Sequence, residues 1–192
     1  MKRPGKVARY KIQRRLGTEL PGLGKAGALE RRPYPPGENG NKRKKYSDFA
    51  LRLEEKQKLR FHYGLKEEQL RRFIHDAKRG AGSNWVSKLV GRLETRLDNI
   101  VFRLGLAPSI RSARQLISHG HILVNDKKMD ISSYVVPTSS TVKIAEKSKE
   151  NQIVLQAQAS PRLDTPEFLQ KNELGGTLQA VPGVEALSLI HI

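Results

Sequence analysis

The chain of 192 residues contains no cysteine. Disulfide frameworks, thiolate nucleophiles and cysteine-based zinc or iron–sulfur sites are therefore excluded. The sequence also has no run of 18 apolar residues, and its first segment, MKRPGKVARYK, is basic and polar. Neither a membrane span nor an export signal is expected, so we predict a reducing, cytoplasm-like compartment and no membrane partner.

Acidic side chains are scarce in this sequence. The chain has 19 Asp and Glu against 36 Lys and Arg, a formal net charge of +17 and a pI near 10.3. Such an imbalance indicates a polyanionic partner. Residues 1–48 carry 14 basic side chains against 4 acidic ones, whereas residues 151–192 carry 2 against 4. The polyanion is therefore expected to contact the first half of the chain and part of the middle, and not its last part.

Common catalytic motifs are missing as well. The sequence contains no G-x-x-x-x-G-K-[ST], H-E-x-x-H or G-x-S-x-G motif, and carboxylates such as Glu94, Asp98 and Asp164 are scattered, as is typical of helix surfaces and caps. GLGKAG, residues 22–27, matches G-x-G-x-x-G, but no strand precedes it and no dinucleotide-binding helix follows. We interpret it as a loop, and expect no enzymatic activity, no cofactor and no small-molecule substrate.

Residues 1–45 are predicted to form an extended basic arm. They hold 5 of the 10 prolines and 7 of the 16 glycines and show no sustained helical or strand period, so they cannot build a core of their own. We expect this arm to become ordered only on its partner.

Residues 46–92 are predicted to form a helical domain, which residues 160–192 are expected to join. Ser47 can cap a first helix that stops at Gly64. In the second helix, EEQLRRFIHDAKRG, the apolar residues recur at helical spacing: Leu70, Phe73, Ile74 and Ala77. After a GAG break, Ser83 can cap a third helix whose apolar stripe continues to Leu104.

Residues 93–159 are predicted to form a small α+β module. Pro108-Ser109 can start a short helix that Gly120 ends, with an apolar face (Ala113, Leu116 and Ile117) and a polar one (Arg111, Arg114, Gln115 and Ser118). HILVNDKKMDI predicts a hairpin that turns at Asn125-Asp126, and residues 133–136 and 141–144 are two further extended pieces. Residues 148–159 favour a helix. The fold class is α+β: a helical domain, a module of two helices with a short antiparallel sheet, and a basic N-terminal arm.

The stretch His119-Gly120-His121 allows three interpretations. A metal clamp needs a third ligand and a spacing that brings the rings together, and a helix-ending glycine between them turns the rings apart, so we expect no metal. A structural role, with His119 near the helix C-terminus, is the simplest alternative. The two rings can also contact bases or phosphates, because they follow the basic helix face.

Basic clusters point to RNA as the polyanion. Lys42, Arg43, Lys44 and Lys45 precede the first predicted helix, and Arg52, Lys56, Lys58 and Arg60 continue along it among aromatic side chains. A solvated helix face with internal ion pairs explains part of this pattern, but not the excess over acids in the arm. Structured RNA is favoured over duplex DNA because no helix has the pattern of a major-groove reader with a dimerisation element.

Two stretches carry a resemblance to a known family. RLDNIVFRLGLAPSIRSARQLISHGHILVNDKKMDISSY, residues 96–134, resembles the RNA-binding fold named after small-subunit ribosomal protein S-four. YPPGENG (34–40) and KKYSDFALRLEEKQKLRFHYGL (44–65) are similar to that ribosomal protein family itself, and the likeness covers residues 1–160. It implies primary binding of 16S-type ribosomal RNA (rRNA) at a multi-helix junction of the 5′ domain, assembly of the small subunit, and contacts with neighbouring ribosomal proteins. It also implies a place where messenger RNA (mRNA) enters and an influence on decoding accuracy.

The resemblance assigns RNA contacts in the module to Arg103, Arg111, Arg114, Gln115, His119, His121, Lys127 and Lys128, and the mRNA-facing stretch to residues 42–45. The complete predicted set of rRNA contacts adds fourteen basic side chains of the first half: Arg3, Arg9, Arg14, Arg15, Lys42, Arg43, Lys44, Lys45, Arg52, Lys56, Lys58, Arg60, Arg71 and Arg72. The location it implies is the ribosome, in the cytoplasm or in an organelle.

Three features depart from the family. The cysteine zinc site of many relatives is absent, the turn is Asn125-Asp126 where Asn-Gly is usual, and VEALSLIHI does not match the family's tyrosine-containing ending. Two rival functions remain at this point. One is an RNA-modifying enzyme that carries the module as an appendage, although no spare region can supply its catalytic domain. The other is a factor for stalled ribosomal particles, which would not need the long arm.

Overall fold

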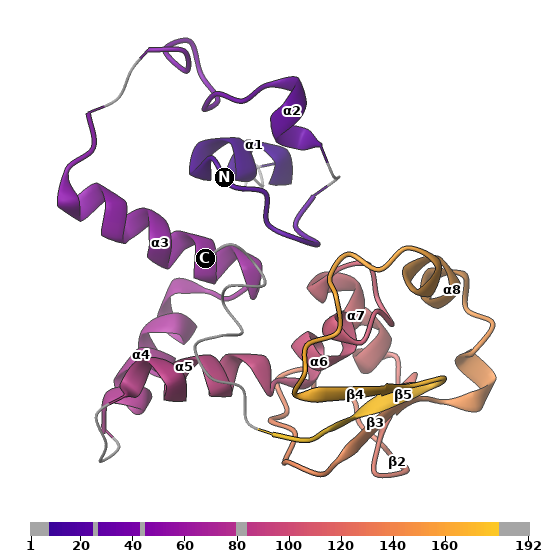
Figure 1. Cartoon of the computed structure of the whole chain (residues 1–192). Coiled ribbons are helices and arrows are strands. Elements are labelled where there is room, and N and C mark those ends of the chain that lie inside the picture. Colours follow the sequence, from indigo (N-terminus) through magenta and orange to yellow (C-terminus); the bar gives the residue numbers. More distant parts are fainter. Residues whose placement is uncertain (1–7, 25–26, 43–44, 80–83, 181–192) are drawn as a thin grey trace, which may run out of the picture.

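The computed structural model describes residues 8–24, 27–42, 45–79 and 84–180. Within them, the first two helices belong to an N-terminal segment that we call the arm, and the next three form a helical unit. Everything from α6 onward forms a sheet module. Figure 1 shows the arm above α3, with α4 and α5 below it and the sheet module beside them.

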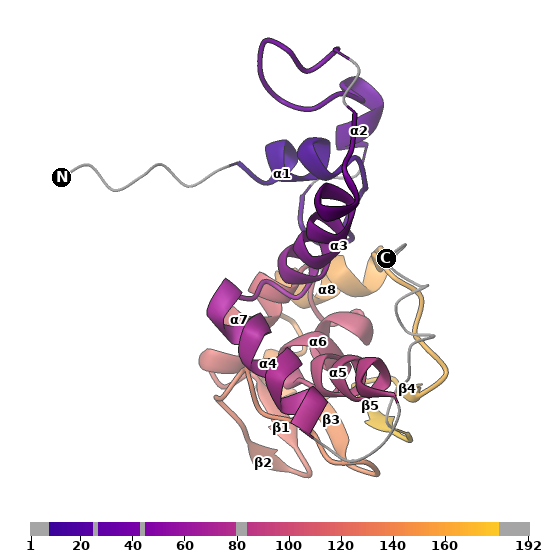
Figure 2. The ribbon, with the colours of Figure 1, turned by 90° about the vertical axis from the view of Figure 1, so that its left-hand side faces the viewer.

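The arm contains two short helices, α1 (Arg9–Leu16) and α2 (Ala28–Arg31), where the sequence predicted none. They form because the arm has a small core after all: Leu16, Leu20 and Leu23 are buried together, and Phe61 of the helical unit packs against them. The missing core is therefore supplied partly by another segment, which the local sequence pattern could not show. Figure 2 shows the arm standing on α3, away from the sheet.

The helical unit follows the sequence prediction closely. Ser47 accepts a hydrogen bond from the backbone of Ala50 and starts α3 (Asp48–His62), and Gly64, with φ +60°, follows its end. In α4 (Glu67–Arg79), Leu70 and Ala77 are buried. Helix α5 (Trp85–Glu94) begins at Asn84, whose side chain caps it, while the predicted cap Ser83 lies outside the described residues.

The single long helix predicted up to Leu104 is wrong. The structure has α5 and a separate α6 (Leu97–Arg103), because Arg96 adopts an extended conformation and bridges Val135. The backbone N–H of Leu97 donates to Tyr134 and that of Val136 donates to Thr95, so residues 132–136 hold the break open. The predicted strand 133–136 is reduced to this one bridge. A continuous apolar stripe could not show the break, because both helices face cores.

The sheet module buries most of the apolar side chains after the break. Helices α6 and α7 (Ile110–Ser118) pack on one face of a five-stranded antiparallel sheet of order β2-β1-β3-β5-β4 (Figure 1). The predicted hairpin is confirmed: β1 (Ile122–Val124) and β2 (Lys127–Lys128) are joined by Asn125 and Asp126, both at positive φ. Strand β3 (Thr141–Ile144), the 3₁₀ turn η1 (Glu146–Ser148) and the predicted helix α8 (Gln152–Ala159) follow.

The described part of the C-terminal segment contradicts its assignment to the helical domain. Strands β4 (Leu169–Asn172) and β5 (Gly175–Leu178) extend the sheet through β3, with Thr141 opposite Thr177. Glycine is required there, since a Cβ on Gly175 would lie 1.9 Å from the carbonyl oxygen of Val142. Within the described part of this segment, Leu163 packs against the core of the helical unit.

Candidate nucleic-acid interface

A buried network of charges fixes the helical unit to the sheet module at the α5–α6 break, which we call the joint. The carboxylate of Glu94 accepts hydrogen bonds from Tyr63 Oη at 2.5 Å, Asn99 Nδ2 at 2.6 Å, and Arg103 Nε and Nη2 at 3.1 and 2.8 Å. Neither Glu94 nor Arg103 is exposed to solvent. Burial and the neighbouring Glu94 carboxylate hold the pKa of Tyr63 well above its usual value, so its hydroxyl remains a donor.

Asp98 is the second anchor of the joint. Its carboxylate accepts from Arg96 Nε and Nη2 at 3.0 and 2.8 Å and from Arg114 Nε at 2.7 Å. Arg114 also donates to the backbone carbonyls of Tyr63 and Gly64, at 2.7 and 2.9 Å, so it ties α7 to the end of α3. Glu94 and Asp98 are thus buried structural anchors, and their prediction as surface or capping groups was wrong.

Three arginines predicted to contact RNA are engaged inside the protein. Arg103 is fully buried beside Glu94, and Arg114 uses its guanidinium group on Asp98 and two carbonyls. Arg14 is buried in the arm, where it lies 4.9 Å over the ring of Tyr34 and donates to the carbonyl of that residue. The prediction for Arg103 is corrected on this ground, because a fully buried guanidinium cannot reach a phosphate. Arg14 also lines a cleft beside the arm, so its contact with RNA stays a prediction. We assign Arg114 to the joint, where it binds Asp98 and the backbone carbonyls of Tyr63 and Gly64.

The remaining predicted contacts of the sheet module lie together on its surface. Arg111 and Gln115 are exposed on α7, and His119 is exposed just after it. The side chain of Lys128 passes over Gly120, since a Cβ there would lie 1.9 Å from Lys128 Cε. The β1–β2 hairpin therefore brings Lys127 and Lys128, both exposed, to the end of the α7 face.

The histidine pair does not form a metal clamp in the structure. Gly120 has φ +73° and ends α7 as predicted, which leaves the ring centroids of His119 and His121 6.0 Å apart. His121 Nδ1 instead lies 2.8 Å from the hydroxyl of Ser148. Among the described residues, no three His, Asp or Glu side chains gather as metal ligands would. Contact of either ring with RNA stays a prediction.

The basic side chains of α3 are partly neutralised within the helical unit. Lys56 forms an ion pair with Glu67, Arg60 lies 3.9 Å from the same carboxylate, and Lys58 lies 2.7 Å from Glu55. The hydrogen bond from Lys56 lowers the pKa of Glu67. The internal ion pairs expected for a solvated helix face are thus present. They leave Arg52 on α3 and Arg72 on α4 as exposed cations, whereas the exposed Arg71 lies 3.9 Å from Glu67.

Within the arm, Arg9, Arg15, Lys42 and Lys45 are exposed, while Arg3, Arg43 and Lys44 lie outside the described residues. The sequence reading missed three further arginines that line a cleft beside the arm: Arg31, Arg32 and Arg162. Arg31 and Arg32 belong to the basic arm and could have been included on charge alone. Arg162 lies in a net-acidic segment, so no local signal marks it.

Because His62 is buried at the end of α3, we expect the free energy of unfolding to fall at acidic pH. Its ring is buried beside Tyr63 and Phe102, and neither ring nitrogen has a hydrogen-bond partner among the described residues. Burial, and then the charge of Arg103, lowers its pKa from 6.5 to about 3. The unfolded state therefore binds a proton more readily below pH 6.5, and the free energy of unfolding should fall by about 2 kcal/mol between about pH 8 and pH 5.

The test is urea unfolding across this pH range for the wild type and for His62→Leu, which cannot titrate at this position. The stability of the wild type relative to His62→Leu should fall by about 2 kcal/mol between about pH 8 and pH 5. Parallel pH profiles for the two proteins would show that His62 is not neutral and buried in the folded state.

The module and its exposed basic groups define a class of protein. A family model described as "S4 domain" matches residues 95–142, and one described as "Ribosomal protein S4/S9 N-terminal domain" matches residues 6–94. The border between the two matches falls at the joint. This is an RNA-binding S4-domain protein of the ribosomal kind.

Curated relatives identify the family. "Small ribosomal subunit protein uS4B" of Bdellovibrio bacteriovorus is 55% identical over 191 residues, which cover 97% of this chain and 92% of the relative. "Small ribosomal subunit protein uS4" of Cyanothece sp. is 44% identical over 184 residues, covering 94% and 89%. "Small ribosomal subunit protein uS4c" of Porphyra purpurea is 45% identical over 184 residues, covering 94% and 90%. The chain belongs to the ribosomal protein S4 (uS4) family, whose role is structural and not enzymatic.

The resemblance, the α+β fold class and the non-enzymatic character predicted from the sequence are thereby confirmed. In the described part of the chain, no helix is long and apolar enough to cross a membrane.

Proposed function

We propose that the chain binds 16S-type rRNA directly, at a junction of helices in the 5′ domain, and thereby starts assembly of the small ribosomal subunit. The observation that carries this proposal is the joint. It holds two surfaces with exposed cations, one on α3–α4 and one on α7 and the β1–β2 hairpin, in one fixed arrangement.

A fixed arrangement suits folded RNA. The wide, shallow groove and the backbone of a folded RNA are recognised by shape and by phosphate contacts. Cations such as Arg72 and Arg111 can meet phosphates of two RNA helices at once if their separation matches that of the helices. Because the hydrogen bonds of the joint already hold the two surfaces in place, orienting these cations costs little conformational entropy on binding.

Footprinting on naked small-subunit rRNA tests this proposal. We expect protection of one compact junction at low protein concentration, before other ribosomal proteins are added. In parallel, the chain should stay with small subunits through a high-salt wash in sedimentation, as a stoichiometric constituent does. Scattered protection of the whole RNA, or release in the wash, would contradict direct structural binding at one junction.

Neighbouring small-subunit proteins are the proposed partners of an exposed apolar surface at the start of α3. Phe49 is 75% exposed and Leu51 is 50% exposed, with Tyr46 and Leu53 also exposed nearby. Clusters of large exposed apolar side chains are typical of protein interfaces. They follow the basic stretch 42–45 in the sequence, and we propose that this stretch faces mRNA where it enters the subunit. Both assignments place the chain in the ribosome.

A crosslinking experiment tests the mRNA contact. A photoreactive group attached at the exposed Lys45 should crosslink to mRNA in reassembled subunits, whereas the same group at the exposed Lys171 of β4 should not. Equal crosslinking from both positions, or none from Lys45, would contradict the proposed orientation.

A further inference from the structure

A basic cleft separates the arm from the sheet module. It has a volume of about 1200 Å³, and its walls come from α1, α2, the loop between them, the start of α7 and the segment after α8. The start of α7 borders the cation surface on α7 and the hairpin, and the other walls lie outside both cation surfaces. The cleft is also lined by the three glycines of the GLGKAG stretch, Gly22, Gly24 and Gly27, whose role the sequence left open.

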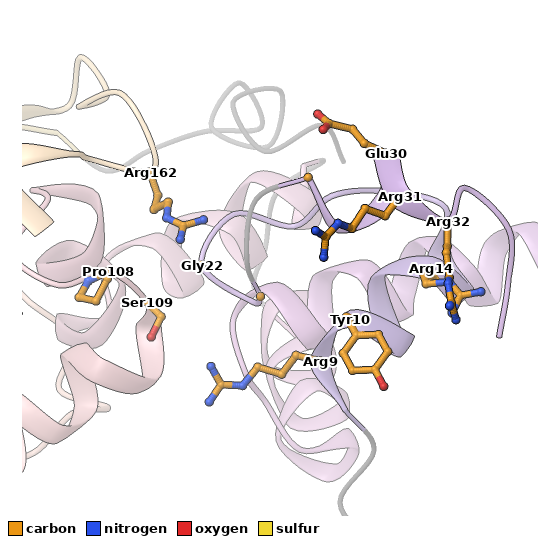
Figure 3. A pocket seen from close by; sticks show the side chains of 12 residues that line it. Arg9, Tyr10, Arg14, Gly22, Glu30, Arg31, Arg32, Pro108, Ser109 and Arg162 are labelled. Atoms are coloured by element: carbon orange, nitrogen blue, oxygen red, sulfur yellow. The ribbon is translucent and has the colours of Figure 1, made fainter.

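Positive charge outweighs negative charge in this cleft, where several arginines and one carboxylate, Glu30, line the walls. In Figure 3 the guanidinium groups of Arg9, Arg31 and Arg162 point toward a common space from three different segments, while the Glu30 carboxylate points away. None of these three groups has a hydrogen-bond or ion-pair partner within the part of the chain that the structure describes. Burial, and then the nearby charge of Arg9, lowers the pKa of Arg111 at the start of α7. Cations that point toward one space from three segments indicate that an anion belongs among them.

The cleft also offers bare backbone and a helix end. Gly22 and Gly24 leave the loop without side chains, and Gly22, at φ +72°, lies so close to the module that a Cβ would come within 2.7 Å of Phe102 Cζ. Ser109 caps α7, a helix of nine residues, and lines the cleft together with Pro108. The positive end of this helix therefore faces the same space as the arginines.

We propose that the cleft holds a short unpaired stretch of RNA, with its phosphates at Arg9, Arg31 and Arg162. The inference rests on the proposed function, and it names a separate subsite and the form of RNA that enters. A duplex carries its phosphates on a broad convex exterior, which a concave site enclosed by arginines on several sides cannot receive. A splayed single strand can enter, and its bases can stack on Tyr10, which lines the cleft and is 51% exposed.

The test compares two triple variants that each remove three positive charges. The cleft variant is Arg9→Ala, Arg31→Ala, Arg162→Ala, and the control is Arg79→Ala, Arg92→Ala, Lys171→Ala, whose side chains are exposed outside the cleft. Binding of a short oligouridylate, an RNA duplex of the same length and full-length small-subunit rRNA is titrated over a salt series. Thermal unfolding checks that both variants fold.

For oligouridylate, the cleft variant should bind at least about tenfold more weakly than the control, and its salt slope should fall by about 2, as three lost single-strand phosphate contacts require. Both variants should bind the duplex alike. Equal losses in the two variants, or an equal loss on duplex and oligouridylate, would overturn the cleft assignment while leaving rRNA binding intact. A wild type that ignores full-length rRNA would overturn the proposed function and this inference together.

Discussion

Replacing Glu94 with glutamine should lower the free energy of unfolding by about 3–5 kcal/mol, because it removes the negative charge that faces the buried guanidinium group of Arg103. The carboxylate accepts four hydrogen bonds from three side chains, and both it and Arg103 are fully buried. A neutral amide offers one acceptor oxygen and turns its NH₂ group toward donors. For a chain of this length the midpoint of thermal unfolding should fall by roughly 6–20 °C.

Glu146→Gln is the matched control, since its side chain is 88% exposed and lies 3.6 Å from Lys149 on the surface. An exposed pair of this kind contributes little, so the control should unfold within about 0.5 kcal/mol of the wild type. Urea denaturation followed by circular dichroism measures both. Equal midpoints for the two variants would show that the Glu94–Arg103 pair does not hold the joint together.

Arg114 and Arg111 lie three residues apart on α7, yet their replacement should have opposite consequences. Arg114→Ala should cost about 3 kcal/mol of stability, because Asp98 loses a buried partner and two carbonyls at the end of α3 lose their donor. Arg114→Lys keeps the charge but loses the planar fork, so it should also be destabilised. Arg111→Ala should leave stability within about 0.5 kcal/mol of the wild type.

The salt dependence of RNA binding is a second property in which replacements of Arg111 and Arg114 should differ. Arg111→Ala should reduce the salt slope of rRNA binding by about 1, as the loss of one phosphate contact does. Arg114→Lys should keep the wild-type slope wherever it is folded. If Arg114→Lys is as stable as the wild type, or if Arg111→Ala leaves the slope unchanged, the assignment of one residue to the joint and the other to RNA is wrong.

Local patterns in the sequence were sufficient to predict the helices and turns whose ends are marked by capping residues or glycine. Ser47, Ser109 and Gly120 mark helix ends whose geometry depends on a few neighbouring residues, and the structure confirms all three. The Asn125-Asp126 turn is confirmed for the same reason, because positive φ is a property of the turn itself.

The features that the sequence could not show all depend on contacts between distant segments. The break between α5 and α6 requires residues 132–136 to pair with it, and strand β5 is recognisable only beside β3. Likewise, charge and spacing place Arg103 and Arg111 in the same class of residue. The structure distinguishes them, because Arg103 is buried against Glu94 whereas Arg111 is exposed to solvent.

The central claim is that exposed cations on a rigid protein hold rRNA through its phosphates. A titration of the purified wild type with naked small-subunit rRNA over a salt series tests it most directly. If six to ten phosphates are contacted, affinity should fall by about 10³–10⁵ between about 50 and 200 mM salt, by the duplex estimate. Binding that is indifferent to salt, or no binding at about 50 mM, would contradict the claim.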